Sequence, residues 1–179
     1  MDHPVLMEEP GFWRIIKLRQ FRRTEGVSFD IMPMEVLPRI DGIDRVIHKR
    51  HAISPGAVGD VARPWYIHSH QEDNLLVLQG KRTAEIYNLK HRRVEVFTVT
   101  PDYVERNGVL VHDGPAMVVW SVNVFHRITT GDEGSASINF AVRHPGFDID
   151  TAFDIFELDT ATGEHRRIRE GRLDQFRDA

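Results

Sequence analysis

Short β-prone runs separated by turn residues constrain the fold of this chain more than any other feature. Stretches rich in Val, Ile, Leu, Thr and Phe alternate with turns that contain Gly, Pro, Asn or Asp. The turns recur about every 8–12 residues, which is typical of an all-β barrel or sandwich. The chain has 179 residues, enough for one domain, or one domain with extensions, around a real core.

The expected strands follow from these runs and from the turns that bound them. They are residues 27–36, 45–53, 82–89, 93–100, 117–130, 135–143, 152–158 and 165–169. The polar stretch 88–92 predicts a hairpin, the stretch from Gly131 to Gly134 predicts another, and a kink is expected near Asn123. Residues 12–21 interleave apolar and basic side chains, a spacing that fits a helix and an irregular strand equally well.

Composition and charge exclude several functional classes. The sequence has no cysteine, so disulfides, thiolate nucleophiles and cysteine-based zinc folds are excluded, and histidine and carboxylate remain as metal ligands. The formal net charge is −4 with scattered basic residues, so no nucleic-acid-binding surface is expected. No apolar run approaches the ~20 residues that a membrane span requires, and the N-terminus lacks the pattern of a signal peptide. We therefore expect a cytoplasmic protein without a membrane partner.

Residues 64–80, which read PWYIHSHQEDNLLVLQG, contain the candidate site. His68 and His70 follow an apolar run, and in a strand Tyr66, His68 and His70 would share one face. Acidic residues come next, and an apolar run then ends at Gly80. Two strands joined by a tight polar turn would hold two imidazoles and a carboxylate together, which predicts half of a metal site.

His126 lies in a later β-prone run and supplies a third imidazole. Neutral nitrogens with one carboxylate suit one divalent ion, Fe, Mn, Ni or Zn, with a coordination position left open for chemistry. The structural alternative is a pair of half-buried strand histidines bonded to backbone carbonyls. His48 and His51 are three residues apart, hence on opposite faces of a strand, and are not expected to be co-ligands.

The pattern resembles the cupin superfamily of RmlC-like jelly-roll barrels, whose first motif runs G-x5-H-x-H-x(3,4)-E-x6-G. His68, His70 and Gly80 occupy motif positions, and Asp73 stands where the family has glutamate. Of the second motif, G-x5-P-x-G-x2-H-x3-N, only His126 is kept. The loop of the first motif is also one residue shorter than usual, and Ala62 replaces its leading glycine.

The resemblance implies an all-β fold, a double-stranded β-helix, with a barrel at residues 45–145. Residues 1–44 would then form an N-terminal extension, and residues 146–179 a C-terminal hairpin and tail. It implies a metal held by His68, His70, Asp73 and His126, with Glu72 as the second choice of acidic ligand. A homodimer is also implied, and the apolar stretch 12–21, which the barrel does not obviously need for its own core, favours it.

The resulting prediction is a metal-dependent enzyme that acts on a small polar organic molecule. The reaction would be a dioxygenation with iron, or an isomerase or lyase step with a redox-inert metal. Two alternatives remain: a non-catalytic small-ligand-binding module, and a metal-free sugar-epimerase-like enzyme. In the latter, His68 or His70 would be the base and Tyr66, the candidate catalytic residue, the acid. Arg143, if it faces inward, would favour a carboxylate or phosphate on the ligand.

Overall fold

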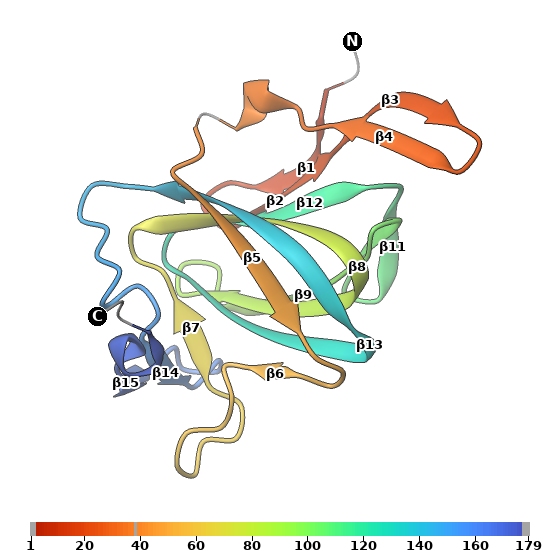
Figure 1. Cartoon of the computed structure of the whole chain (residues 1–179). Coiled ribbons are helices and arrows are strands. Elements are labelled where there is room, and N and C mark those ends of the chain that lie inside the picture. Colours follow the sequence, from red (N-terminus) through yellow and green to blue (C-terminus); the bar gives the residue numbers. More distant parts are fainter. Residues whose placement is uncertain (1–2, 38, 177–179) are drawn as a thin grey trace.

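The computed structural model describes residues 3–37 and 39–176, which form fifteen strands and two short 3-10 helices, so the predicted all-β class is confirmed (Figure 1). The strands are β1 (Val5–Glu9), β2 (Trp13–Lys17), β3 (Arg19–Thr24), β4 (Val27–Ile31), β5 (Gly42–His48), β6 (Ile53–Ser54), β7 (Trp65–Ile67), β8 (Gln71–Asn88), β9 (Arg93–Val99), β10 (Tyr103–Arg106), β11 (Val109–Asp113), β12 (Ala116–Trp120), β13 (Val124–Arg143), β14 (Ile155–Leu158) and β15 (His165–Arg169). The 3-10 helices are η1 (Met34–Val36) and η2 (Gly171–Asp174). No helix among the described residues has the length and apolar character of a membrane span.

The two longest strands, β8 and β13, form the antiparallel spine of the barrel. Their ladder shifts register where Gly80 lies opposite Ser135, and both strands bend there. Gly80 has a φ of +72°, and a β-carbon at this position would overlap the carbonyl oxygen of Gly134. The hairpin predicted from Gly131 to Gly134 is therefore wrong, because the chain continues along the same partner strand instead of reversing.

The remaining strands flank this spine. β9 returns beside β8, which confirms the hairpin predicted around residues 88–92. β5 pairs with the second half of β13, and β12 joins β8 to β2. The predicted kink is confirmed at Asn123, which has a φ of +59° and separates β12 from β13.

Residues 12–21 contain β2 and the first residues of β3 and no helix, and most of their apolar side chains belong to the core. Phe12, Trp13, Ile15 and Ile16 are at most 2% exposed. β2 pairs with β12 along its whole length and so extends the barrel sheet. The idea that the barrel does not need this stretch for its own core is therefore wrong, while the proposed boundaries at residues 44 and 145 stay a prediction.

Strands β3 and β4 form a separate two-stranded sheet that projects from the barrel (Figure 1). Its apolar side chains are exposed, namely Phe21 at 62%, Val27 at 55%, Phe29 at 50% and Ile31 at 40%. Phe21 and Phe29 touch edge to face, with ring centroids 5.1 Å apart. An isolated two-stranded sheet is marginally stable in water, so this hairpin gains little from its own contacts.

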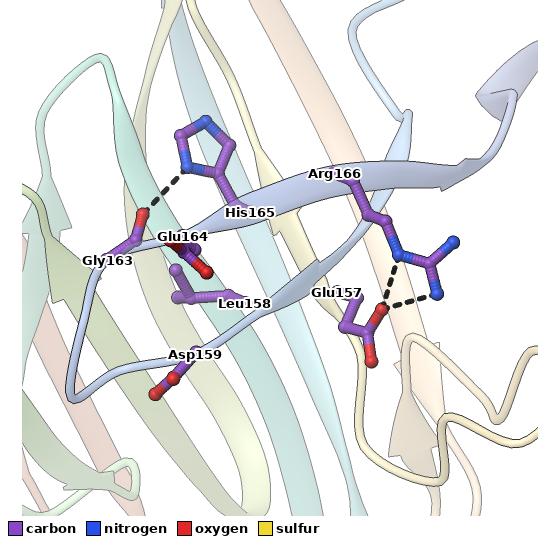
Figure 2. A pocket seen from close by; sticks show the side chains of 7 residues that line it. All are labelled: Glu157, Leu158, Asp159, Gly163, Glu164, His165 and Arg166. Atoms are coloured by element: carbon purple, nitrogen blue, oxygen red, sulfur yellow. Dashed lines mark hydrogen bonds and ion pairs between the residues drawn. The ribbon is translucent and has the colours of Figure 1, made fainter.

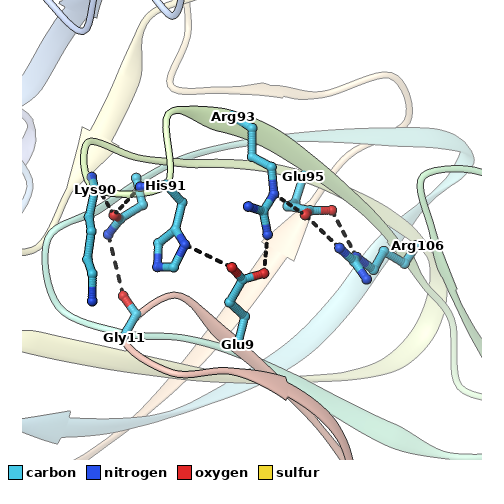
Figure 3. A network of polar contacts seen from close by, with 8 residues as sticks. Glu9, Gly11, Lys90, His91, Arg93, Glu95 and Arg106 are labelled. Carbon is cyan, nitrogen blue, oxygen red and sulfur yellow. Dashed lines mark hydrogen bonds and ion pairs between the residues drawn. The ribbon is translucent and has the colours of Figure 1, made fainter.

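A polar network on the barrel wall surrounds the buried carboxylate of Glu95 on β9 (Figure 3). Glu95 is 1% exposed and accepts hydrogen bonds from Arg93 at 2.8 Å, Arg106 at 2.7 and 2.9 Å, and Asn107 at 2.7 Å. Glu9 on β1 pairs with Arg93 and, at 2.8 Å, with His91, so the network ties the first strand to β9. Burial alone would raise the pKa of Glu95, but the hydrogen bonds from Arg106, Arg93 and Asn107 outweigh it and lower that pKa to about 2.

Candidate functional site

The barrel contains a cavity of about 350 Å³, lined by polar, aromatic and aliphatic side chains from six strands (β5, β6, β7, β8, β12 and β13) and from the loops after β7 and before β14. This volume lies at the lower end of the range for small-molecule sites, about 300–1,000 Å³. His68, Asp73 and His126 line the cavity together with Tyr66. One potential ligand atom of each of the first three lies within 4.8 Å of the others.

Asp73 is the centre of the site. It lies on β8, is 5% exposed, and faces Trp120 across the β8–β12 ladder. Oδ2 accepts the indole N–H of Trp120 at 3.0 Å, and Oδ1 accepts amide N–H groups of Gln71 and Asn139 at 2.8 Å each. Burial opposes ionisation of Asp73, but the charge and hydrogen bond of His68 and the contacts with His126 and Gln71 outweigh it and lower the pKa. Asp73 is therefore a fixed negative charge inside the barrel.

His68 follows the end of β7 and is 4% exposed. Its Nδ1–H donates to the backbone carbonyl of Ala152, which leaves Nε2 facing Oδ2 of Asp73 at 3.3 Å. Burial favours neutral His68, but the Asp73 charge and the hydrogen bonds that His68 donates to Asp73 and Ala152 raise its pKa above the usual value. The 3.3 Å between Nε2 of His68 and Oδ2 of Asp73 is longer than a normal N–H···O hydrogen bond of about 2.7–3.2 Å. Asp73 therefore stabilises a proton on Nε2 mainly through its charge, and the hydrogen bond itself is weak.

His126 lies near the start of β13, and its ring centroid is 4.7 Å from that of His68. Its Nδ1 contacts the carbonyl oxygen of Val124 at 3.3 Å, and its Nε2 lies 4.0 Å from Oδ2 of Asp73. Burial and the charge of His68 lower the pKa of His126 to about 4. The site therefore combines one proton-binding imidazole with one neutral imidazole.

Tyr66 lies on β7 directly opposite His126 in the β7–β13 ladder, with ring centroids 5.8 Å apart. Burial raises the pKa of Tyr66, and the smaller effect of a hydrogen bond with Ser54 does not reverse this. The phenol is therefore protonated at neutral pH and can donate a proton. Phe153 touches both Tyr66 and His68 edge to face and closes this side of the cavity.

His70 does not join the cluster, so the expected convergence of three imidazoles is wrong. β7 ends at Ile67, and residues 68–70 bend instead of continuing the strand. Strand alternation therefore does not place His68 and His70 on one face. The side chain of His70 is exposed and lies beside Gly146. It lines a separate hollow of about 130 Å³ that His68 also borders, and it does not line the barrel cavity.

The two acidic residues after His70 face opposite sides of β8. Since β8 begins at Gln71, both acids lie in a strand and not in the predicted turn. Asp73 points into the barrel, whereas Glu72 points out and pairs with Arg14 at 2.7 Å. The acidic residue of the site is therefore Asp73, and Glu72, the second choice, is excluded by its orientation.

Sequence reasoning missed several contributors to the site. Trp120 and Gln71 bind the carboxylate of Asp73, and Arg82 with His48 lines another part of the cavity. The signal for Arg82 was present in the sequence, because it alternates with the buried residues Ala84 and Ile86 on an otherwise apolar face.

Arg143, the arginine singled out from the sequence, does not line the cavity. Its guanidinium carbon lies 4.4 Å from the ring centroid of Phe147. A larger hollow, of about 660 Å³, lies on the β14–β15 hairpin and is lined by that hairpin alone (Figure 2). Several of its polar groups already have partners there, as in the 2.6 Å ion pair between Arg166 and Glu157 and the contact of His165 with the carbonyl of Gly163. This hollow lacks the buried titratable cluster of the barrel cavity.

Comparison with solved structures places the fold in a known class. A dTDP-sugar isomerase from Desulfovibrio desulfuricans G20 superposes with a TM-score of 0.57 at 16% identity, covering 95% of this chain and 88% of that one. The sugar 3,4-ketoisomerase QdtA from Thermoanaerobacterium thermosaccharolyticum, in complex with TDP, gives 0.55 at 11% identity, covering 78% and 85%. ChmJ, a 3'-monoepimerase from Streptomyces bikiniensis in complex with dTDP-quinovose, gives 0.53 at 10% identity, covering 78% and 67%.

No protein-family model and no curated protein sequence matches this chain. The structural likeness nevertheless bears out the expected fold, because the chain has the same jelly-roll barrel architecture as these solved structures.

Proposed function

We propose that the protein is an isomerase or epimerase that moves a proton beside a carbonyl group of a sugar. The observation that carries this proposal is the buried His68–Asp73 pair, which shares one cavity with the phenol of Tyr66. The similarity in fold to sugar isomerases and an epimerase supports a sugar as the ligand, although fold by itself does not determine function.

In the proposed reaction, neutral His68 removes a proton from the carbon next to the carbonyl and becomes an imidazolium. Asp73 stabilises this charge, and the carbonyl of Ala152 fixes the ring by accepting its Nδ1–H. Tyr66 donates its phenolic proton to the carbonyl oxygen, which gives an enediol. The imidazolium of His68 then gives the proton to the former carbonyl carbon, and the hydroxyl on the carbon that was first deprotonated gives its proton to the tyrosinate of Tyr66. The carbonyl thereby moves by one carbon without a net change in protons or electrons.

The test is to incubate the protein in D₂O with a panel of keto sugars, both free and linked to dTDP, and to follow each carbon-bound proton by NMR. We expect deuterium to replace a proton beside the carbonyl of at least one sugar, together with an isomerised or epimerised product. Thermal stabilisation by a sugar with neither exchange nor product would instead indicate a non-catalytic binding module.

A divalent metal site is the second candidate, favoured by the convergence of His68, Asp73 and His126. The donor set fits, because Nδ1 of each histidine faces a backbone carbonyl and Nε2 is left as the ligand atom. His68, His126 and Asp73 would hold the ion, which would polarise a carbonyl oxygen of the substrate as a Lewis acid.

The metal reading predicts close to one equivalent of Fe, Mn, Ni or Zn in the purified protein, measured by elemental analysis. Substitution His126→Gln is then expected to lower the bound metal at least tenfold, since it removes one of three protein ligands. His70→Gln is the matched control and should leave the metal content unchanged, because His70 lies outside the cluster. Equal metal content in all three proteins would remove this candidate.

The projecting β3–β4 hairpin supports a homodimer. Its exposed apolar side chains form a patch centred on Phe21 and Phe29, and such patches commonly mark protein–protein contacts. We infer that a second copy of this chain covers the patch. A marginally stable two-stranded sheet needs a partner that is present whenever the protein itself is present, and a second copy meets this condition.

The double substitution Phe21→Ser and Phe29→Ser is expected to convert a dimer to a monomer, measured by sedimentation equilibrium, because it removes most of the apolar patch. Leu110→Ser, at an exposed apolar position on β11, is the control and should leave the mass unchanged. A monomeric wild-type protein, or a double variant that remains dimeric, would contradict this interface.

A further inference from the structure

Arg82 lies inside the barrel on β8 and lines the same cavity as His68 and Tyr66. The residue is 3% exposed. Its Nη2 donates to Nδ1 of His48 at 2.6 Å, and its Nε donates to the hydroxyl of Ser135 at 3.3 Å. Because a guanidinium only donates, Nδ1 of His48 is the acceptor and the proton of this imidazole lies on Nε2.

No carboxylate of the described residues lies within 4.0 Å of the Arg82 guanidinium. Other partly buried arginines do have such partners, as Arg14 has Glu72 and Arg127 has Glu85, both within 2.7 Å. Burial lowers the pKa of Arg82 to about 10, which still leaves it charged at neutral pH. A buried charge without a counter-ion is costly, so this guanidinium is expected to have a partner that the chain itself does not provide.

The guanidinium also has donors to spare. Two of its five N–H groups are used by His48 and Ser135, and the described part of the chain offers no further side-chain acceptor. The remaining N–H groups on Nη1 and Nη2 form the fork that binds two oxygens of one planar anion. His48 adds no charge, since burial and Arg82 lower its pKa to about 4. Two carboxylates also line the cavity, but Asp44 accepts from Asn139 at 3.2 Å and Asp73 accepts from Gln71, Trp120 and Asn139. The free N–H groups of Arg82 are therefore left for one carboxylate of a ligand.

We propose that Arg82, positioned by His48 and Ser135, binds the carboxylate of an acidic ligand inside the barrel cavity. His126 lies opposite Ile86 in the β8–β13 ladder, and Ile86 is four residues beyond Arg82 on β8. Arg82 and His126 are therefore four residues apart along the ladder. At about 3.3 Å per residue this is ~13 Å along the backbone. Both side chains line the same cavity, so we expect a ligand of about one sugar unit to contact both.

This proposal rests on the proposed function for one point only, that the ligand is a sugar. The substrate would then be a sugar acid, with its carboxylate on Arg82 and its reactive carbon near His68. The binding of the carboxylate depends on Arg82 and not on catalysis. The two ideas therefore fail separately. If acidic sugars bind through Arg82 but no proton exchange is found with any sugar, the proposed reaction is wrong and the anion site stands.

The test compares binding of D-galacturonate with that of D-galactose, which has the same ring but no carboxylate, by isothermal titration calorimetry. We expect galacturonate to bind wild-type protein at least tenfold more tightly than galactose, and Arg82→Met to abolish this preference. Arg127→Met is the matched control, because Arg127 is a half-buried arginine outside the cavity, and it should keep the preference.

A stability measurement separates a ligand-binding arginine from a structural one. Since Arg82 has no carboxylate partner, Arg82→Met is expected to melt at the same temperature as wild-type protein or above it, whereas Arg127→Met should melt lower. Equal affinity for galacturonate and galactose would overturn the proposal. So would an Arg82→Met variant that retains the preference, one that melts well below wild type, or inorganic phosphate that binds more tightly than galacturonate.

Discussion

Replacing His68 with glutamine is expected to lower the rate of deuterium exchange into a sugar substrate by about 10²–10⁴-fold, the usual contribution of a general acid–base. Glutamine retains an amide that can donate to the carbonyl of Ala152, but it cannot take up a proton at the position of Nε2. The measurement is the initial rate of exchange by NMR, at equal protein concentration for variant and wild type.

His70→Gln is the control for this variant. The two histidines are two residues apart, but His70 is exposed beside Gly146 and should leave the exchange rate within about twofold of wild type. A thermal melt of each variant shows whether the site has been lost by unfolding. A folded His68→Gln protein that exchanges at a wild-type rate would contradict the role of His68.

The largest effect on stability is expected at Glu95. Its folded-state pKa of about 2 lies below the ordinary value of 4.5, so ionisation of Glu95 stabilises the folded protein above pH 4.5. This stabilisation, about 3 kcal/mol at 1.36 kcal/mol per pKa unit, is lost as the pH falls from about 4.5 to about 2. Glu95→Gln should therefore lower the free energy of unfolding by about 2–4 kcal/mol at pH 7.

Urea unfolding of both proteins between pH 7 and pH 3 measures this prediction. The wild-type protein should lose stability as the pH falls, and the Glu95→Gln protein should show a flatter pH dependence. Glu157→Gln is the control, because Glu157 pairs with an exposed arginine and should change stability by about 1 kcal/mol or less. Parallel pH profiles for wild type and Glu95→Gln would contradict the role of this network.

Strand positions could be predicted wherever side-chain alternation and local turns determine the structure. The hairpin between β8 and β9 and the break at Asn123 follow from turn residues close in sequence. The stretch from Gly131 to Gly134 has the same local composition, yet it is a bend within β13. Its outcome depends on Gly80, a residue far away in the sequence, which it meets across the ladder. This contact cannot be predicted from residues that are close together in the sequence.

The candidate site shows the same division. His68, Asp73 and His126 are brought together because each lies in or directly beside a strand that faces the barrel interior. His70 was misplaced because β7 ends after only three residues, a boundary set by its pairing with β13 and β14. The place of Arg82 depends on the closure of the barrel, because only then does a charged residue on an otherwise apolar strand face become a cation inside the cavity.

The most direct test of the central claim is to measure deuterium exchange into the sugar substrate after metal has been removed. The protein is dialysed against a strong chelator until elemental analysis finds less than a tenth of an equivalent of metal, and the exchange rate is compared before and after. If His68, Asp73 and Tyr66 move the proton by themselves, the rate should be unchanged. Loss of exchange on chelation, with recovery when Zn, Mn, Ni or Fe is added back, would contradict this account.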